Sequence, residues 1–309
     1  MSGVSVLTIA RGRDAALANV VRGLCRQTVL PDELVIARMQ DAPYDLPDAP
    51  FPIRQIHVSG KELPLASARN AAARAATRDS LVFLDADCIP APDLVEEYRS
   101  GIEAWGGILM GEVMYLPSGA LEGGIDYAAF DAASEKHSDR RGPPEDGIDI
   151  CNDYRCFWSL NFGLSRAAFE RIGGFDERYY GYGGEDTDFG KTAVVAGLPI
   201  GWLKGGRVYH QYHAHHMPPI HHLHAVVRNA LKFEEKWGYR TMGHWLYAFG
   251  LMGLLDEDES GALRILREPN DADRALSSQS EGMPYVNTAR VIRALQAMKE
   301  TASPRIAAE

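Results

Sequence analysis

The sequence has no excess of positive charge. Its 32 lysines and arginines are outnumbered by 42 aspartates and glutamates, so the formal net charge is −10 at pH 7. A protein that coats DNA or RNA normally presents a basic face to the phosphates. The charge balance therefore argues against a nucleic-acid partner, although a local basic pocket for one diphosphate remains compatible with it.

Long apolar segments are also missing. The most apolar run towards the C-terminal end, Leu246–Leu255, is interrupted by Gly250 and Gly253. It is shorter than the roughly 20 residues that a membrane-spanning helix needs. The chain opens with a strand-like apolar run, without the basic region and apolar core of a signal peptide. We expect no membrane span and a cytoplasmic location, with peripheral membrane association through the C-terminal helices as the alternative.

Cysteine is scarce. The chain has four cysteines, and only Cys151 and Cys156 are close in sequence. No pair has the C-x-x-C spacing of a zinc or redox site. Free thiols are therefore expected, as in cytoplasmic proteins, and a Cys151–Cys156 disulfide is the alternative.

The first half of the chain alternates short apolar runs with segments of helical period. An apolar fraction of 46% and a charged fraction of 24% are typical of a globular protein. The alternation predicts an α/β fold in which helices flank a mostly parallel central sheet. The strands expected in this part are Val4–Ile9, Glu33–Ala37, Ile53–Val58, Leu81–Leu84 and Ile108–Leu116.

The chain is long enough for one large domain with an appendage. We expect a catalytic domain over residues 1–217 and a helical C-terminal extension over 218–309. Within the domain, residues 1 to about 116 would bind the nucleotide, and residues from about 150 to 217 would bind the acceptor. The stretch between them, 117–150, is rich in glycine, proline and charge, which is typical of a long functional loop or lid.

Two carboxylates follow the buried strand expected at Leu81–Leu84. Asp85 and Asp87 lie one residue apart at its carboxyl end, which is where ligands bind in open α/β sheets. Burying carboxylates is costly unless a positive group compensates them. A divalent cation bridging to a diphosphate would do so, because Mg²⁺ and Mn²⁺ prefer hard oxygen ligands. A solvated acidic turn is the alternative interpretation.

A second acidic pair follows a glycine-rich segment. Gly183 and Gly184 precede Glu185 and Asp186 at the start of an expected helix. Glycine lets a substrate approach the backbone closely, and the helix dipole favours ionised carboxylates at this end. One of these carboxylates could act as a general base on a sugar hydroxyl, whereas helix capping is the alternative role.

Basic residues and histidines complete the candidate site. Arg69, at the start of an alanine-rich helix, could contact a phosphate or base, with a surface salt bridge as the alternative. Seven of the ten histidines fall between His210 and His224. His210 and His213 follow an expected strand, so one of them could join Asp87 around a metal. An imidazole among carboxylates would favour Mn²⁺ over Mg²⁺, and a separate zinc or nickel site is the competing interpretation.

In their order along the chain, these segments resemble family 2 glycosyltransferases, and the later part resembles the galactosyltransferase-type module of related enzymes. The resemblance covers residues 3–215. It implies a GT-A fold, a divalent metal, inversion at the anomeric carbon, a nucleotide-diphosphate sugar donor that is most often UDP-linked, and a hydroxyl-bearing acceptor such as a carbohydrate. The motifs that carry it are Val4–Ile9, Leu65–Asn70, Phe83–Asp87, Asn161–Phe162, Gly173–Glu177, Gly183–Asp188 and His210–His213.

The resemblance also implies residue roles. Asp87 would ligate the metal together with His210 or, in its place, His213. Asp186 would be the catalytic base and Glu185 would bind the acceptor, with the reverse assignment open. The nucleotide-sugar contacts would come from Arg11, Asp41, Arg69, Asp85, Trp158, Asn161 and Gly184.

One departure affects the base contact. The family usually has an acidic residue directly after the second strand, to read the uracil. Here Asp41 lies further along, so it would have to be displaced into that role. A nucleotidyltransferase and a non-catalytic sugar- or metal-binding module are the alternatives to a glycosyltransferase.

Overall fold

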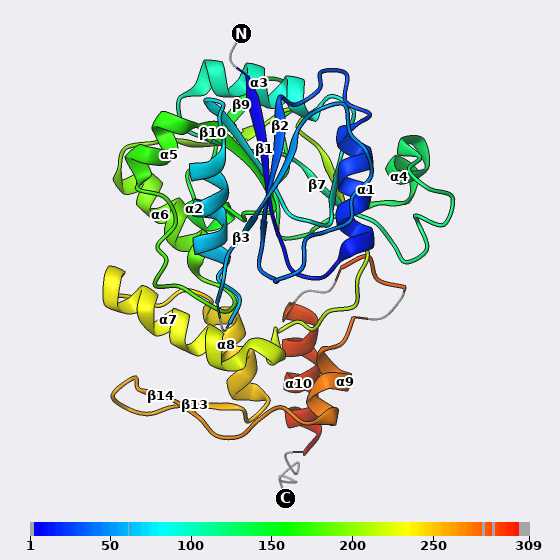
Figure 1. The fold of residues 1–309 in the computed structure, drawn as a ribbon. Coiled ribbons are helices and arrows are strands. Elements are labelled where there is room, and N and C mark those ends of the chain that lie inside the picture. Colours follow the sequence, from blue (N-terminus) through cyan, green and yellow to red (C-terminus); the bar gives the residue numbers. More distant parts are fainter. Residues whose placement is uncertain (1–2, 61, 280–281, 286–287, 303–309) are drawn as a thin grey trace, which may run out of the picture. The chain divides into compact units, whose positions relative to one another are not determined.

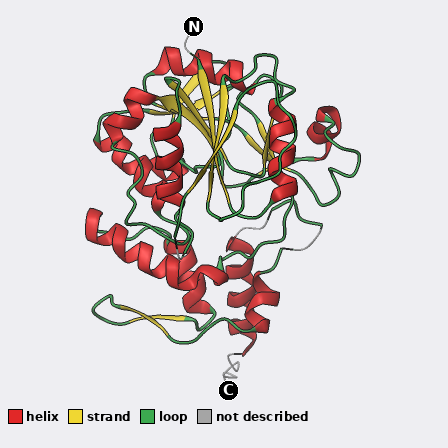
Figure 2. Ribbon diagram, viewed as in Figure 1, coloured by secondary structure: helices red, strands yellow, loops and turns green. Residues whose placement is uncertain are grey.

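The computed structural model describes residues 3–60, 62–279, 282–285 and 288–302. The chain divides into two compact units, Met1–Tyr212 and His213–Glu309. Figure 1 shows the elements of both units, and Figure 2 shows that strands form the centre of the first. All candidate site residues except His213 belong to this first unit.

An eight-stranded sheet forms the centre of the first unit, in the order β3-β2-β1-β4-β10-β6-β11-β9. Strands β3, β2, β1 and β4 are mutually parallel, whereas β10 runs antiparallel to both β4 and β6. Strands β6 and β11 are parallel to each other and run in the same direction as β4, whereas β9 is antiparallel to β11. This confirms the expected α/β fold with a mostly parallel central sheet. In sheet order, the strands span Ile53–His57, Glu33–Arg38, Val4–Ala10, Ser80–Leu84, Asn161–Ser165, Ile108–Met110, Ile200–Leu203 and Ile148–Ile150.

Helices cover both sides of the parallel half. Figure 1 shows α1 (Asp14–Leu24) and α2 (Leu65–Ala75) on opposite sides of these strands. Helix α2 buries Ala66, Ala68 and Ala72, and such small side chains allow it to pack close to the sheet, as the sequence predicts. The other helices of this unit are α3 (Leu94–Trp105), α4 (Tyr127–Ala133), α5 (Arg166–Ile172) and α6 (Glu185–Val195).

A second, four-stranded sheet has the order β5-β12-β7-β8. Its strand β5 begins directly after Asp87, and its strand β12 ends at His210. The sequence predicts a single strand over Ile108–Leu116, but the chain leaves the large sheet at Gly111 and continues as β7 in the small one. A side chain at Gly111 would collide with the Gly206 carbonyl oxygen, 2.1 Å from the position of a Cβ, so this crossing requires glycine. The strands of the small sheet are β5 (Cys88–Pro90), β12 (Val208–His210), β7 (Val113–Tyr115) and β8 (Glu135–Lys136).

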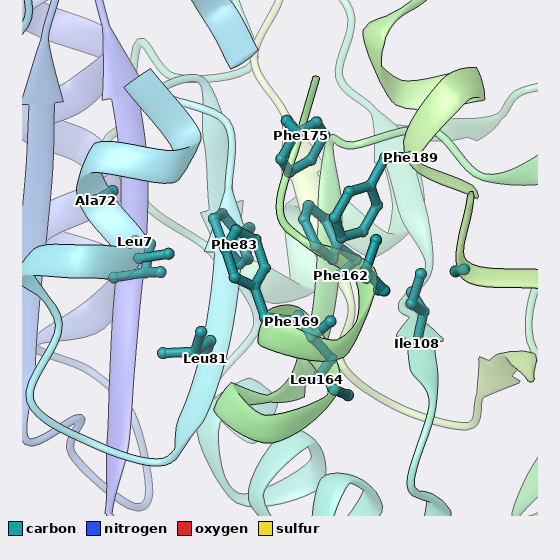
Figure 3. Close-up of a cluster of buried hydrophobic side chains, with 14 of the residues drawn as sticks. Leu7, Ala72, Leu81, Phe83, Ile108, Phe162, Leu164, Phe169, Phe175 and Phe189 are labelled. Atoms are coloured by element: carbon teal, nitrogen blue, oxygen red, sulfur yellow. The ribbon is translucent and has the colours of Figure 1, made fainter. Parts of the chain in front are cut away.

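An aromatic cluster joins the sheet to the site-bearing segments (Figure 3). Phe83 of β4 stacks on Phe162 of β10 with 4.5 Å between ring centroids, and Phe175 stacks on Phe189 of α6 at 4.1 Å. Stacked pairs contribute about 0.5–1.5 kcal/mol beyond their area burial. The cluster therefore fixes the end of β4, which carries one acidic pair, against the segment that carries the other.

The second unit is mainly helical, as expected for the C-terminal extension. It contains α7 (Leu223–Trp237), α8 (Gly243–Leu251), α9 (Asp271–Ser277), α10 (Thr288–Ala302), a short 3-10 helix at Ile220–His222 and the hairpin β13–β14 (Leu255–Glu257 and Leu263–Ile265). Throughout the described residues, no helix combines the length and apolarity needed to cross a bilayer.

Candidate active site

The D-x-D segment forms a tight turn at the carboxyl end of β4. The Asp85 backbone NH donates to the Leu160 carbonyl (2.9 Å), and the Cys88 NH donates back to the Asp85 carbonyl (3.0 Å). The Gln211 NH donates to the Asp87 carbonyl (2.8 Å), which ties the turn to the end of β12. The two aspartates are therefore held by backbone hydrogen bonds to segments far away in the sequence.

Asp87 lies among possible metal ligands. A carboxylate oxygen of Asp87 and ring nitrogens of His210 and His213 lie within 4.8 Å of one another, and Asp87 Oδ1 is 3.6 Å from His210 Nε2. One carboxylate and two imidazoles form a donor set that a divalent transition metal accepts. The site thus fits the metal that the sequence predicts. Both His210 and His213 belong to the group, so the structure does not single out one of them.

Arg13 contacts the same aspartate. Its Nη1 lies 2.6 Å from Asp87 Oδ2. The residue directly precedes α1 and adopts a left-handed conformation (φ 59°), which is uncommon for a residue with a side chain. Arg11 and Arg13 are both exposed. The sequence did not lead us to Arg13, and the nucleotide contact of Arg11 stays a prediction.

Arg69 joins the two acidic pairs. Its side chain is 5% exposed, and its guanidinium lies 3.1 Å from Glu185 Oε1 and 3.5 Å from Asp85 Oδ1. The guanidinium also lies 5.3 Å from the ring centroid of Phe175. These contacts favour a role in holding the carboxylates together over the predicted contact with the nucleotide. A buried guanidinium also offsets the repulsion between acidic groups that face one another.

Glu185 and Asp186 form the first turn of α6. The residue before them, Gly184, has φ of 90°, a conformation that L-residues with a side chain rarely adopt. Asp186 Oδ1 accepts a hydrogen bond from the Thr187 NH (2.7 Å), while Glu185 forms an ion pair with Arg69. Glu185 is therefore the member of the pair that this arginine holds in place.

Burial changes the proton affinity of these groups. Desolvation raises the pKa of Asp186 to about 7, and the neighbouring Glu185 carboxylate adds to the increase. Desolvation likewise raises the pKa of Asp85 to about 6, although Arg69 opposes this effect. A carboxylate whose pKa lies near neutrality is well suited to accept a proton in a reaction.

The other residues predicted to contact the nucleotide or the sugar differ in exposure and in their partners. Trp158 is half-buried, with its ring 5.1 Å from that of His137. Asn161 is 0% exposed. Its side-chain oxygen accepts a hydrogen bond from the Tyr98 hydroxyl (2.8 Å), and its side-chain NH₂ donates one to the Gly206 carbonyl (2.6 Å). These bonds favour a structural role over contact with a sugar. Asp41 is fully exposed and lies 3.3 Å from His57 Nε2, so its contact with a base remains a prediction.

The other histidines of the cluster have local partners. His216 Nδ1 lies 2.9 Å from Ser277 Oγ, and His224 Nε2 lies 2.6 Å from Glu268 Oε1. Within the part of the chain that the structure describes, Asp87, His210 and His213 are the only group of three or more such side chains placed so that they could hold a metal. The structure therefore gives no support to a second site for zinc or nickel. All four cysteines are free, as expected.

Two family models match the chain. The model described as glycosyl transferase family 2 matches residues 5–172, and the model described as the N-terminal domain of galactosyltransferase matches residues 145–216. Together, they include the D-x-D turn, the glycine-rich segment, the acidic pair of α6 and both histidines of the metal group.

Curated relatives match at low identity. A validoxylamine A glucosyltransferase of Streptomyces hygroscopicus subsp. limoneus is 27% identical over 230 residues, which cover 64% of this chain and 49% of the relative. A chondroitin synthase of Escherichia coli is 22% identical over 245 residues, covering 68% of this chain and 35% of that protein. The chain thus spans about half the length of the first relative and less of the second.

A solved structure supports the fold assignment. The structure of GalNAc-T7 with UDP, GalNAc and Mn²⁺ aligns with a TM-score of 0.55 at 13% identity, covering 81% of this chain and 51% of that one. At this identity the likeness concerns the fold alone, which is of the GT-A type.

Proposed function

The chain belongs to glycosyl transferase family 2, and we propose that it transfers a sugar from a nucleotide-diphosphate donor, UDP-linked, to an acceptor hydroxyl. We further propose that the reaction depends on a divalent metal, Mn²⁺ in preference to Mg²⁺, and inverts the anomeric carbon. The observation that carries the proposal is the D-x-D turn, in which Asp87 belongs to the group that could hold a metal while Asp85 is linked to Glu185 of the second acidic pair through the buried Arg69. GalNAc-T7, with which the chain shares its fold, was solved with UDP and Mn²⁺, which is why we choose these two ligands for the first tests.

Asp87, His210 and His213 would hold the metal. When bound, the ion would act as a Lewis acid that offsets the negative charge of the departing diphosphate. Arg13 already contacts Asp87, so its guanidinium is placed to add positive charge on the same side. Arg11, Trp158 and Gly184 stay as proposed contacts for the nucleotide or the sugar.

Asp186 would be the general base. Its raised pKa gives it the proton affinity to take the hydrogen of the acceptor hydroxyl as that oxygen attacks the anomeric carbon. The bond from the anomeric carbon to the diphosphate oxygen breaks in the same step, so the configuration inverts and UDP leaves. Glu185, held by Arg69, would bind another acceptor hydroxyl.

The proposal is tested by incubating the protein with a panel of UDP-sugars, candidate hydroxyl acceptors and Mn²⁺. We expect UDP release that requires both the metal and an acceptor and that is lost in Asp87→Asn. NMR of the product should show the anomeric configuration opposite to that of the donor, and retention would contradict inversion. In a separate incubation with UTP, sugar 1-phosphates and Mn²⁺, release of pyrophosphate with formation of a UDP-sugar would indicate a nucleotidyltransferase instead. Binding of UDP-sugars without turnover of any would indicate a non-catalytic module.

A further inference from the structure

Arg140 is a buried cation in the segment between β8 and β9. The residue is 5% exposed, and its backbone NH donates to the His137 carbonyl (3.1 Å) in a turn. Its guanidinium carbon lies 4.9 Å from the ring centroid of Trp202 and 5.3 Å from that of Trp158. The side chain is therefore enclosed by aromatic faces, which attract a cation but accept no conventional hydrogen bond.

The guanidinium has no anionic partner among the described residues. Its Nη1 and Nη2 atoms are buried, and none of the described residues accepts a hydrogen bond from them. Desolvation lowers the pKa of the guanidinium, and the side chains of Tyr115, Tyr98, Cys88 and Cys156 oppose this effect. A buried, unpaired charge is strongly unfavourable, so its presence needs an explanation that the described polypeptide itself does not supply.

A series of ring contacts connects Trp158, which lies against Arg140, with His210 of the metal-binding group. The Trp158 ring contacts His137 (5.1 Å between centroids), His137 lies beside Tyr115 (5.7 Å), and Tyr115 lies beside His210 (4.9 Å). Of the two rings that enclose the guanidinium, Trp202 is 1% exposed, whereas Trp158 is half-buried. Trp158, the more exposed of the two rings, is also a residue that we propose to contact the nucleotide or the sugar.

We propose that Arg140 binds an oxyanion of the sugar donor when that donor occupies the site. The inference rests on the proposed function and adds a substrate-recognition residue to it. The planar guanidinium is suited to two parallel hydrogen bonds with a phosphate or a carboxylate. Two parts of a donor offer this chemistry: the diphosphate, and the carboxylate of a uronic acid sugar. Binding of either supplies the acceptors that Nη1 and Nη2 lack.

The test replaces the charge with an apolar side chain of similar length, in Arg140→Met. The adjacent Arg141 provides a matched control, because it is 69% exposed and pairs with Asp149 on the surface (3.0 Å). Calorimetry with Mn²⁺ would measure the binding of UDP, UDP-glucose and UDP-glucuronate to both variants and to the wild type. Loss of a hydrogen bond to a charged group corresponds to a decrease in affinity of roughly 10- to 100-fold.

We expect Arg140→Met to lose that affinity and Arg141→Met to keep it. A loss for all three ligands assigns the diphosphate, and a loss for UDP-glucuronate alone assigns the carboxylate. Unchanged affinity for every ligand overturns the inference. A wild type that binds none of the three overturns the proposed function instead, and with it the premise of this inference.

Stability separates this role from a structural one. Because the unpaired charge is unfavourable without a ligand, ligand-free Arg140→Met should unfold in urea at the wild-type concentration or a higher one. A variant that is less stable or does not fold would show that the cation supports the fold and would contradict the proposal. Arg140→Lys keeps the charge without the planar fork, and we expect its affinity to lie between those of the wild type and Arg140→Met.

Discussion

Replacing Asp186 with asparagine removes the proposed base at little steric cost. The amide keeps the size of the carboxyl group and can still accept from the Thr187 NH, which lies 2.7 Å from Asp186 Oδ1 in the structure. It cannot take up a proton at neutral pH. General base catalysis typically contributes about 10²- to 10⁴-fold. At 1.36 kcal/mol for each factor of ten, the variant should raise the barrier by about 3–5 kcal/mol.

The assay compares kcat for UDP release with the affinity for UDP and Mn²⁺. We expect kcat of Asp186→Asn to fall by about 10²- to 10⁴-fold, with UDP affinity unchanged because the residue does not belong to the metal-binding group. Glu185→Gln is the matched comparison, since its carboxylate is paired with Arg69. Near-normal turnover in Asp186→Asn together with a large loss in Glu185→Gln would reverse the assignment of the two roles.

The pH dependence gives an independent check of the same residue. Burial raises the pKa of Asp186 to about 7, so the group is protonated, and inactive as a base, at lower pH. Because this pKa is that of the ligand-free protein, wild-type kcat/KM should rise with pH through about 7 and level off above it. A profile that is already flat from pH 5 upward would show that no group of raised pKa limits the reaction.

Three further predictions concern the fold and the metal. Arg69→Met leaves the buried Glu185 and the half-buried Asp85 without their partner and should destabilise the protein by about 3–5 kcal/mol, measured by urea unfolding; a change below about 1 kcal/mol would contradict the bridging role. Phe162→Ala empties a fully buried aromatic site and should cost about 3–5 kcal/mol in the same assay, whereas a loss of less than 1 kcal/mol would show that the cluster relaxes. His210→Ala and His213→Ala should each weaken Mn²⁺ binding at least about 10-fold, because even the loss of outer-shell partners typically costs that much; EPR titration measures it, and a variant with wild-type affinity would exclude that histidine as a ligand.

The parts of the fold that follow local rules were predictable. The four apolar residues before Asp85 form β4 with every side chain buried, and the small residues of the next predicted helix pack on the sheet as α2. The acidic pair after Gly184 begins α6. In each case, the pattern of apolar residues and the turn-forming glycines lie within one short segment.

The sequence predictions fail where the structure depends on contacts between segments that are far apart in the sequence. The predicted strand Ile108–Leu116 is divided between two sheets, and Gly111, where the chain leaves the first sheet, packs against the Gly206 carbonyl, a contact that no local pattern encodes. Arg13 could have been considered from its place at the start of α1, but its contact with Asp87 depends on the tertiary fold. Arg140 lies in a segment without hydrophobic periodicity, so its burial between two tryptophans could not be predicted from the sequence pattern.

The most direct test of the account is calorimetric titration of UDP into the tag-free protein, with and without Mn²⁺, for the wild type and Asp87→Ala. We predict that UDP binds the wild type only when Mn²⁺ is present and that Asp87→Ala loses this binding. Metal-independent binding of equal strength in both proteins, or no binding of UDP to the wild type under either condition, would contradict it.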